Sequence, residues 1–502
     1  MTSGAGFWAT SRKIILDPFS LGCLLMSAVL TALCLPPYTV SLLAWIALIP
    51  LLVVLDGKTV IEGFWLGFYW GIALWGLTVY WAFVYHVVAL PGLVISMALY
   101  SSLLGVLGCY LQKRLQPVRL LVFPILWVCI EHLRSSGIYA FPWNVIGYSQ
   151  YLNLPLLQLA SLGSVWIISF LIVLVNVALA QCYLQSNKFR PKAVAVLAML
   201  LVAFSWFWGQ RELTLSYPKQ GLTIGLVQAN FPNDFKFRPE NLDLLIEQTR
   251  ELKNNKPQLV VWTETAIMHY ITTDAMARRK IFELAKEMNA HILLGAPNME
   301  MISEEEIKYY NSAFLVTPKE EIAGVYSKMH LVPFGEFLPL ARRFKWIEWL
   351  EAQVNSGGFS EGEEYKVFEL GAQRFASLIC FEGVFDPLVR RFVNQGAQFM
   401  VNITNDGWSN SSASHYQHLA FASFRAVENR VFFIRAGNTG VSAFIDPLGR
   451  IYAQTKTFVK AALVEQIGLP GNKTFYNKYG NLFMGLLWLG LGSGVAWTLK
   501  NR

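Results

Sequence analysis

A glutamate, a lysine and a cysteine follow three short apolar runs in the second half of this chain. The runs "VVWTET", "VYSKMHLVPFGE" and "LICFEG" supply Glu264, Lys328 and Cys380, each at the end of a strand-like segment. Layered α/β folds usually assemble their sites at the carboxyl ends of strands. A carboxylate, a cation and a thiol placed together could activate a nucleophile and stabilise an oxyanion, as acyl transfer through a covalent intermediate requires.

Each of these residues also has an ordinary interpretation. A single glutamate or lysine is usually a solvated surface residue, and a lone cysteine after an apolar strand is usually a small buried hydrophobe. The chain holds six cysteines, and five of them lie in long apolar runs. Cys380 is the single cysteine between residues 221 and 468, so no disulfide can form within that region. We therefore expect Cys380 to be a nucleophile.

The elements that would position these residues alternate along residues 221–468. Short apolar runs bounded by turn residues predict strands, and two stretches with apolar residues at helical spacing, 241–255 and 272–290, predict helices. The pattern predicts a layered α/β domain that buries its own core. The predicted strands are 221–230, 257–265, 290–297, 311–318, 321–330, 374–382, 397–406, 430–440 and 441–449.

The rest of the chain has the composition of a membrane protein. Of its 502 residues 54% are hydrophobic and 15% charged, whereas soluble proteins are charged at about a quarter of their positions. We expect a bundle of about seven transmembrane helices in residues 1–212 and one more in residues 480–502, which makes about eight. The predicted spans are 19–35, 37–55, 63–85, 87–111, 120–132, 155–184, 193–208 and 482–499.

The distribution of lysine and arginine predicts the orientation of these spans. One side collects eleven of these residues, including Arg12, Lys58, Lys113 and Lys500, and the other side holds only Arg134. Both termini are therefore expected in the cytoplasm and the α/β domain outside it, on the periplasmic face of a bacterial inner membrane. The net charge of +8 partly reflects this sorting, so it indicates no nucleic-acid partner.

Four stretches resemble the signature sequences of the nitrilase, or carbon–nitrogen hydrolase, superfamily: "VVWTET", "YSKMHLVPFGE", "LICFE" and "NITNDGW". The arrangement of the spans, "KMHLVPFGEFLP" and "FPWNVIGYSQ" also resemble the membrane-embedded branch, the apolipoprotein N-acyltransferases. The resemblance covers nearly the whole chain. It implies an αββα sandwich with Glu264 as base, Lys328 as cationic donor and Cys380 as nucleophile, while the N–H of Phe381 would be a second oxyanion donor.

Three further polar residues near the motifs have two interpretations each. By the resemblance Glu336 would orient the lysine and the incoming amine, and Glu382 would fix the loop beside the nucleophile. A structural salt bridge is the alternative for both. His330 could be a base, but Glu264 already fills that role, so we interpret His330 as part of a structural turn.

Aromatic residues are candidates for substrate contacts. Trp408 would line an acyl pocket or pack in its turn, and Phe237 stands where the resemblance leads us to expect a tryptophan. Trp143 lies in a segment that is either a re-entrant loop near a lipid entry or an interfacial anchor. Residues 342–351 could form an amphipathic helix at the membrane interface or packed on their own domain.

The resemblance implies transfer of a fatty acyl chain from a phospholipid, the sn-1 chain of phosphatidylethanolamine, to the α-amine of the diacylglyceryl-cysteine of an apolipoprotein. A membrane-tethered amidase or nitrilase with water as acceptor would use the same residues. A non-catalytic transporter or receptor is disfavoured, because few charged residues beyond Glu62 and Glu131 lie within the spans. We expect no cofactor, because no Cys/His cluster has metal-ligand spacing and no glycine-rich phosphate loop is present. We also expect a monomer.

Overall fold

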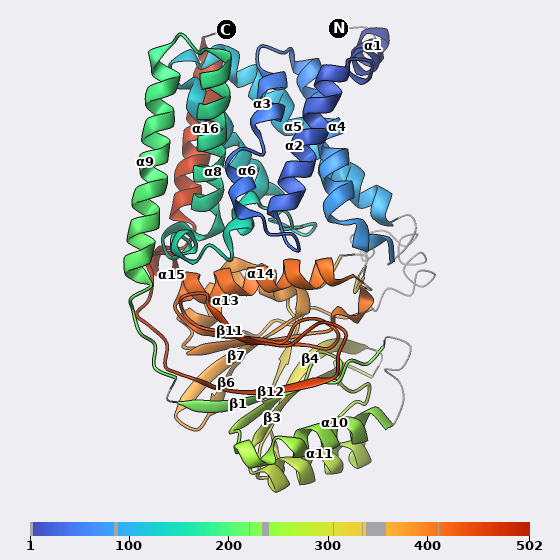
Figure 1. Cartoon of the computed structure of the whole chain (residues 1–502). Helices are drawn as coiled ribbons and strands as arrows, with labels where there is room; N and C mark the ends of the chain where they lie inside the picture. The colour runs from blue at the N-terminus through green and yellow to red at the C-terminus, as the bar shows by residue number, and fades with distance from the viewer. Residues whose placement is uncertain are drawn as a thin grey trace. The chain divides into compact units, whose positions relative to one another are not determined.

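The computed structural model divides the chain into two compact units, a helical one and an α/β one (Figure 1). The helical unit comprises Met1–Thr214 and Tyr479–Arg502, and the α/β unit comprises Leu215–Lys478. The structure describes residues 4–84, 89–219, 221–232, 240–304, 306–333, 335–337, 358–409 and 411–501.

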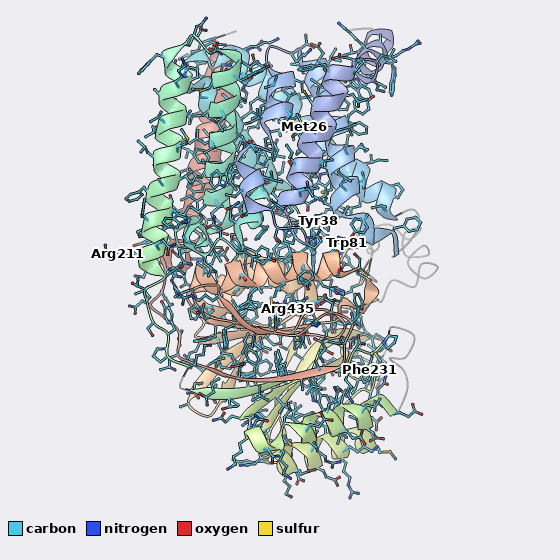
Figure 2. The ribbon with its side chains drawn as sticks, in the orientation of Figure 1. Met26, Tyr38, Trp81, Arg211, Phe231 and Arg435 are labelled. Carbon is cyan, nitrogen blue, oxygen red and sulfur yellow. The ribbon has the colours of Figure 1, made fainter. Side chains whose placement is uncertain are left out.

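Five helices in the described part of the helical unit are long and apolar enough to cross a membrane: α4 (Val60–Thr78), α5 (Ala89–Arg114), α8 (Ala160–Leu184), α9 (Phe189–Glu212) and α16 (Leu482–Lys500). A sixth candidate is the pair α1 (Gly4–Ile15) and α2 (Pro18–Cys34), which bends by 74°. Large apolar side chains remain exposed on these helices, among them Met26 (Figure 2), Phe204 and Leu489. Such surfaces suit contact with lipid.

One expected span takes a different form, and another is short, as its predicted length indicated. Instead of one helix over residues 37–55, the chain forms a 3₁₀ turn, Ser41–Trp45, and the short helix α3 (Ile49–Leu55). Pro36 and Pro37 end α2, and proline cannot continue a helix. The expected span 120–132 is α6 (Arg119–Arg134), whose 16 residues extend only about 24 Å, less than the roughly 30 Å of a bilayer core.

A seam of small residues joins α4 and α5. A Cβ atom added at Gly63 would lie 2.5 Å from the carbonyl oxygen of Gly105, and one added at Gly67 would lie 2.2 Å from that of Ser101. Gly71 continues the same face, four residues further on, against Ala98. Small residues at this spacing let two helix backbones approach closely within a membrane. The seam therefore fixes these two helices against each other.

The α/β unit contains two six-stranded sheets with matching topology. The first has the order β12-β1-β2-β3-β4-β5 and the second β11-β10-β9-β8-β7-β6. Three neighbouring strands are parallel in each sheet, β1 to β3 and β7 to β9, and antiparallel strands flank them. The strands are β1 (Leu222–Gln228), β2 (Leu259–Val261), β3 (His291–Met301), β4 (Ile307–Val316), β5 (Ile322–Ser327), β6 (Val367–Leu370), β7 (Gln373–Ile379), β8 (Phe399–Thr404), β9 (Phe432–Gly437), β10 (Ala443–Ile445), β11 (Ile451–Gln454) and β12 (Ala461–Ile467).

Helices cover the outer face of each sheet (Figure 1), so the expected αββα sandwich is confirmed. Helices α10 (Glu240–Glu251) and α11 (Ala275–Met288) pack on the first sheet around Trp262. Helices α13 (Asp386–Asn394) and α14 (Ser412–Asn429) pack on the second, and the short helix α15 (Phe475–Tyr479) follows the last strand. A larger core fills the space between the sheets, with Leu226 from the first and Phe375 from the second among its buried members.

Candidate active site

The two sheets contribute different parts of the site. Glu264 lies three residues beyond β2 and Lys328 directly follows β5, so both belong to the first sheet. Cys380 directly follows β7 of the second sheet. Glycine is required on the neighbouring strand β3, because a Cβ atom at Gly295 would lie 2.7 Å from the Cα atom of Glu264. The absence of a side chain at Gly295 therefore lets the loop of Glu264 pack closely against β3.

Glu264, Lys328 and Glu336 form one buried ionic cluster. The ammonium of Lys328 lies 2.8 Å from Oε1 of Glu336 and 3.6 Å from Oε1 of Glu264. Lys328 is 1% exposed and Glu264 is 6% exposed. Burial opposes the charge of Lys328, but the carboxylates of Glu336 and Glu264 outweigh that effect and raise its pKa. The lysine therefore remains a cation in an interior position.

A side chain that sequence reasoning did not single out links the two carboxylates. The amide nitrogen of Asn311, on β4, donates to Oε1 of Glu264 at 2.8 Å and to Oε1 of Glu336 at 3.1 Å. The other oxygen of Glu264 accepts a hydrogen bond from the backbone N–H of Asn405 at 2.7 Å. An amide side chain at the start of the strand-like run "NSAFLVTP" is the sequence signal that could have found Asn311.

The backbone at Cys380 is strained. Its φ is +52°, in the left-handed region that residues with a side chain seldom adopt. The chain turns there from β7 directly into a short 3₁₀ helix, Cys380–Val384. Backbone strain of this kind clusters at functional sites. Here it places the cysteine at the sharp reversal between strand and helix.

The Cys380 thiol is held in its neutral form. Burial raises its pKa, the negative charge of Glu264 raises it further, and the positive charge of Lys328 acts in the opposite direction. Both charged groups therefore lie close enough to Cys380 to influence its ionisation. A thiol in this state needs a base to remove its proton during attack, and Glu264 is the carboxylate that acts on it most strongly.

Glu382 joins the loops that carry Lys328 and Cys380. Its Oε1 accepts hydrogen bonds from the Tyr326 hydroxyl at 2.7 Å and from the backbone N–H groups of Met329 at 2.7 Å and His330 at 3.1 Å. Its Oε2 accepts from the N–H of Ile379 at 2.8 Å. Glu382 is fully buried and these four donors surround its carboxylate. The contacts consist of hydrogen bonds rather than the salt bridge that was the alternative.

Phe381, His330 and Trp408 are the remaining described candidates near the motifs. The Phe381 side chain is buried, with its ring centroid 5.0 Å from that of Phe385. The ring of His330 packs on the same Phe385, at 4.9 Å. Trp408 ends the 3₁₀ turn Asp406–Trp408. Phe237 and the stretch 342–351 lie outside the described residues.

Trp143 belongs to the helical unit and is buried there. Its ring stacks on Phe141 with centroids 5.0 Å apart, and Trp81 lies against it at 6.0 Å. Arg134, which was expected on the outer surface, is 5% exposed. Its guanidinium donates to the carbonyl oxygens of Phe141, at 2.8 Å, and of Trp143. Arg134 therefore holds this loop in place instead of facing water.

A second buried network lies behind Cys380 and was not anticipated from the sequence. Asp406 pairs with Arg435 at 2.6 Å, and His418 contacts both of them. All three side chains are at most 3% exposed, and Arg435, in the interior of the sandwich, is labelled in Figure 2. Asp406 lies in the signature stretch "NITNDGW", but the sequence gives no indication of its partners Arg435 and His418. Across the described ranges, no group of three or more His, Cys, Asp or Glu side chains could hold a metal ion.

The family model described as carbon–nitrogen hydrolase matches residues 223–471. This range forms the αββα sandwich and includes Glu264, Lys328 and Cys380. The model for the N-terminal domain of apolipoprotein N-acyltransferases matches residues 27–178.

Relatives of known name extend the match to nearly the whole chain. The apolipoprotein N-acyltransferase of Geobacter metallireducens is 35% identical over 483 residues, 91% of each chain. That of Chlorobaculum tepidum is 29% identical over 96% of each chain. The chain belongs to the apolipoprotein N-acyltransferase family.

Solved structures similar to this one cover about half of the chain. An amidase from Nesterenkonia sp. is 18% identical, covers 55% of this chain and 98% of its own, and has a TM-score of 0.40. A carbon–nitrogen hydrolase from Helicobacter pylori G27 is 16% identical, covers 49% and 89%, and has a TM-score of 0.39.

Proposed function

We propose that the protein transfers a fatty acyl chain from a membrane phospholipid to the α-amine of the diacylglyceryl-cysteine of apolipoproteins, through a thioester on Cys380. The observation that supports the proposal is the buried ion pair of Lys328 and Glu264, whose charges both act on the Cys380 thiol. The family membership and the apolar helices supply the context, since both substrates are lipids that diffuse in a bilayer.

In the first step Cys380 becomes acylated. Glu264 accepts the thiol proton as the sulfur attacks the ester carbonyl of the phospholipid. The resulting oxyanion is stabilised by the ammonium of Lys328 and by the backbone N–H of Phe381. Collapse of this intermediate breaks the ester bond, and Glu264 returns its proton to the departing lysophospholipid oxygen. Sulfur and acyl carbon are then joined as a thioester.

In the second step the acyl chain leaves Cys380. The α-amine of the lipoprotein attacks the thioester carbonyl, and its proton passes to Glu264 and then to the leaving sulfur. The products are an amide and the free thiol. Glu336 holds Lys328 through their 2.8 Å ion pair and orients the amine. The expected aromatic contacts at Phe237, Trp408 and Trp143 belong to the lipid-binding part of this proposal.

The same proposal includes a location. Both termini lie at one end of the helical unit (Figure 1). Arg12 and Lys13 end α1 near this end, and Lys500 lies in the last turn of α16. Positively charged residues stay in the cytoplasm. This supports cytoplasmic termini in a bacterial inner membrane and a catalytic domain on the periplasmic face. The donor is phosphatidylethanolamine and the enzyme acts as a monomer.

Intact-protein and peptide mass spectrometry tests the proposal. Purified enzyme is incubated with phosphatidylethanolamine labelled in its sn-1 chain and then with a diacylglyceryl peptide bearing a free α-amine. We expect an acyl mass on the Cys380 peptide of the wild type, its absence from Cys380→Ala, and transfer to the peptide amine. Cys182→Ala serves as the matched control and should label normally.

Two outcomes would contradict the proposal. Acyl label retained in Cys380→Ala would place the chemistry elsewhere. Release of free fatty acid with no acylated peptide would identify a hydrolase that uses water as the acceptor.

A further inference from the structure

The carbonyl oxygen of Cys380 is held by two buried side-chain donors. Nε2 of His418, on α14, lies 3.1 Å from it, and Nδ2 of Asn402, on β8, lies 3.3 Å from it. His418 is 3% exposed and Asn402 is 2% exposed. One backbone oxygen thus accepts hydrogen bonds from two different elements, α14 and β8.

The surroundings of His418 select one tautomer. The guanidinium of Arg435 lies 3.2 Å from Nδ1 and can only donate, so Nδ1 must accept. The carbonyl of Cys380 can only accept, so Nε2 must carry the hydrogen. Oδ1 of Asp406 also lies 3.3 Å from Nδ1, but it finds a donor in the Thr404 hydroxyl at 3.2 Å. Burial lowers the pKa of His418, which favours this neutral form.

A buried ion pair fixes the position of His418. Oδ2 of Asp406 accepts a hydrogen bond from Arg435 at 2.6 Å. Burial opposes ionisation of Asp406, but the charge of Arg435 outweighs it and holds the pKa of that carboxyl well below its usual range. A Cβ atom at Gly440 would lie 1.9 Å from Oδ2, so only glycine leaves room for the pair. The Asp406–Arg435 pair that contacts His418 is therefore charged and closely packed.

The peptide that these donors hold is the one that follows the nucleophile. Cys380 and Phe381 share a trans peptide, in which the C=O and the N–H lie on opposite edges of one plane. Donors on the oxygen fix the plane, and they polarise the peptide so that its N–H becomes a stronger donor. We infer that His418 and Asn402 are positioning residues that orient and polarise the Cys380–Phe381 peptide for its role as an oxyanion donor. This inference rests on the proposed function.

Two reactions of the same sulfur separate this role from a general structural one. Acylation by phospholipid passes through an oxyanion, whereas alkylation by iodoacetamide displaces iodide at a saturated carbon and needs no oxyanion donor. We expect His418→Phe to slow acylation about tenfold, the value of one well-placed hydrogen bond, and to leave alkylation within about twofold. His418→Gln keeps an N–H at similar reach and should recover most of the acylation rate.

His415 provides the matched control. It lies on the same helix, is fully buried, and its Nε2 is 3.1 Å from the backbone oxygen of Asp406 rather than that of Cys380. His415→Phe should lower the melting temperature about as much as His418→Phe, yet leave the acylation rate unchanged. Asn402→Leu is the second variant, and it should slow acylation selectively as His418→Phe does.

The outcomes are distinguishable from failure of the proposed function. If Cys380→Ala still forms the acyl-enzyme, the proposed function is wrong. If Cys380→Ala is inactive but His418→Phe and Asn402→Leu acylate at the wild-type rate, only the positioning role is overturned. Two further results would show that the contacts are only structural and would overturn the positioning role. One is an equal fall in the alkylation and acylation rates, and the other is loss of folded protein in both variants.

Discussion

The backbone N–H of Met329 donates to the carboxylate of Glu382 at 2.7 Å. Met329 follows Lys328 directly, and Glu382 lies two residues beyond Cys380. One carboxylate thus connects the loop of the cation to the loop of the thiol, although the two loops come from different sheets. The spacing between ammonium and sulfur therefore depends on Glu382 as well as on each loop.

Replacing Glu382 by glutamine should separate these loops. An NH₂ group would replace one accepting oxygen, and one of the surrounding N–H donors would lose its acceptor. We expect Glu382→Gln to lose about 1–3 kcal/mol of stability and to slow acylation more than Tyr326→Phe, which removes a single donor worth about 1 kcal/mol. Thermal unfolding in detergent and single-turnover acylation would measure both effects.

Tyr452→Phe is the control for that pair of variants. The Tyr452 hydroxyl donates to the Gln466 carbonyl at 3.0 Å, away from the nucleophile loop. This variant should acylate normally. Wild-type stability and rate in Glu382→Gln would contradict the connection between the loops.

The reactivity of Cys380 should keep rising with pH. Burial raises the thiol pKa, the Glu264 carboxylate raises it further, and Lys328 only partly offsets them. Below its pKa the thiolate fraction grows tenfold with each pH unit, and a free cysteine levels off above about 8.5. We expect the iodoacetamide rate at Cys380, followed by peptide mass spectrometry, to increase without a plateau from about pH 7 to about pH 10. A plateau near that of free cysteine would contradict this.

Removing the carboxylate of Glu264 should have opposite effects on two reactions. Glu264→Gln deletes the proposed base, so acyl transfer should fall about 10²–10⁴-fold. It also deletes a negative charge that raises the Cys380 pKa, while Lys328 remains to lower it. Alkylation at about pH 8 should therefore become faster than in the wild type.

The exposed acid Glu283 offers a control for that substitution. Its side chain is 58% exposed on α11, so Glu283→Gln should change neither reaction. Slower alkylation in Glu264→Gln would show that the carboxylate does not act on the thiol electrostatically.

The seam between α4 and α5 should tolerate no side chain at Gly105. A Cβ atom there would lie 2.0 Å from the carbonyl oxygen of Gly63, which is backbone and cannot move aside alone. We expect Gly105→Ala to destabilise the protein by about 1–3 kcal/mol, as overpacking does. On the same pair of helices Gly76 has nothing within 4 Å, so Gly76→Ala should be neutral. Equal melting temperatures for the two variants in detergent would contradict the seam.

The sequence predicted nine strands of the sandwich, because strands of alternating or continuous apolar character carry a local signal, but it missed the edge strands β6, β11 and β12. It also predicted the strand ends at which Glu264, Lys328 and Cys380 lie. The membrane spans were harder to predict. Hydropathy alone does not reveal where the chain turns, so the division of the expected span 37–55 into a 3₁₀ turn and α3 emerged only in the structure.

The supporting residues of the site could not be predicted for a different reason. Asn311, Asp406 and His418 act through partners that are distant in sequence, such as Glu264, 47 residues from Asn311. A single asparagine or histidine in an apolar segment has no local feature that indicates such a partner. Only the register of the strands and the pairing of the sheets determine these contacts.

The proposed base Glu264 and the proposed nucleophile Cys380 follow strands of opposite sheets, so the packing between the sheets affects the distance between them. Leu226 and Phe375 fill the layer between the two sheets, so their volumes help to set how far a proton must travel between sulfur and carboxylate. Repacking that layer would alter turnover without touching any polar group. The distance between the two sheets would therefore help to set the rate of proton transfer in the proposed reaction.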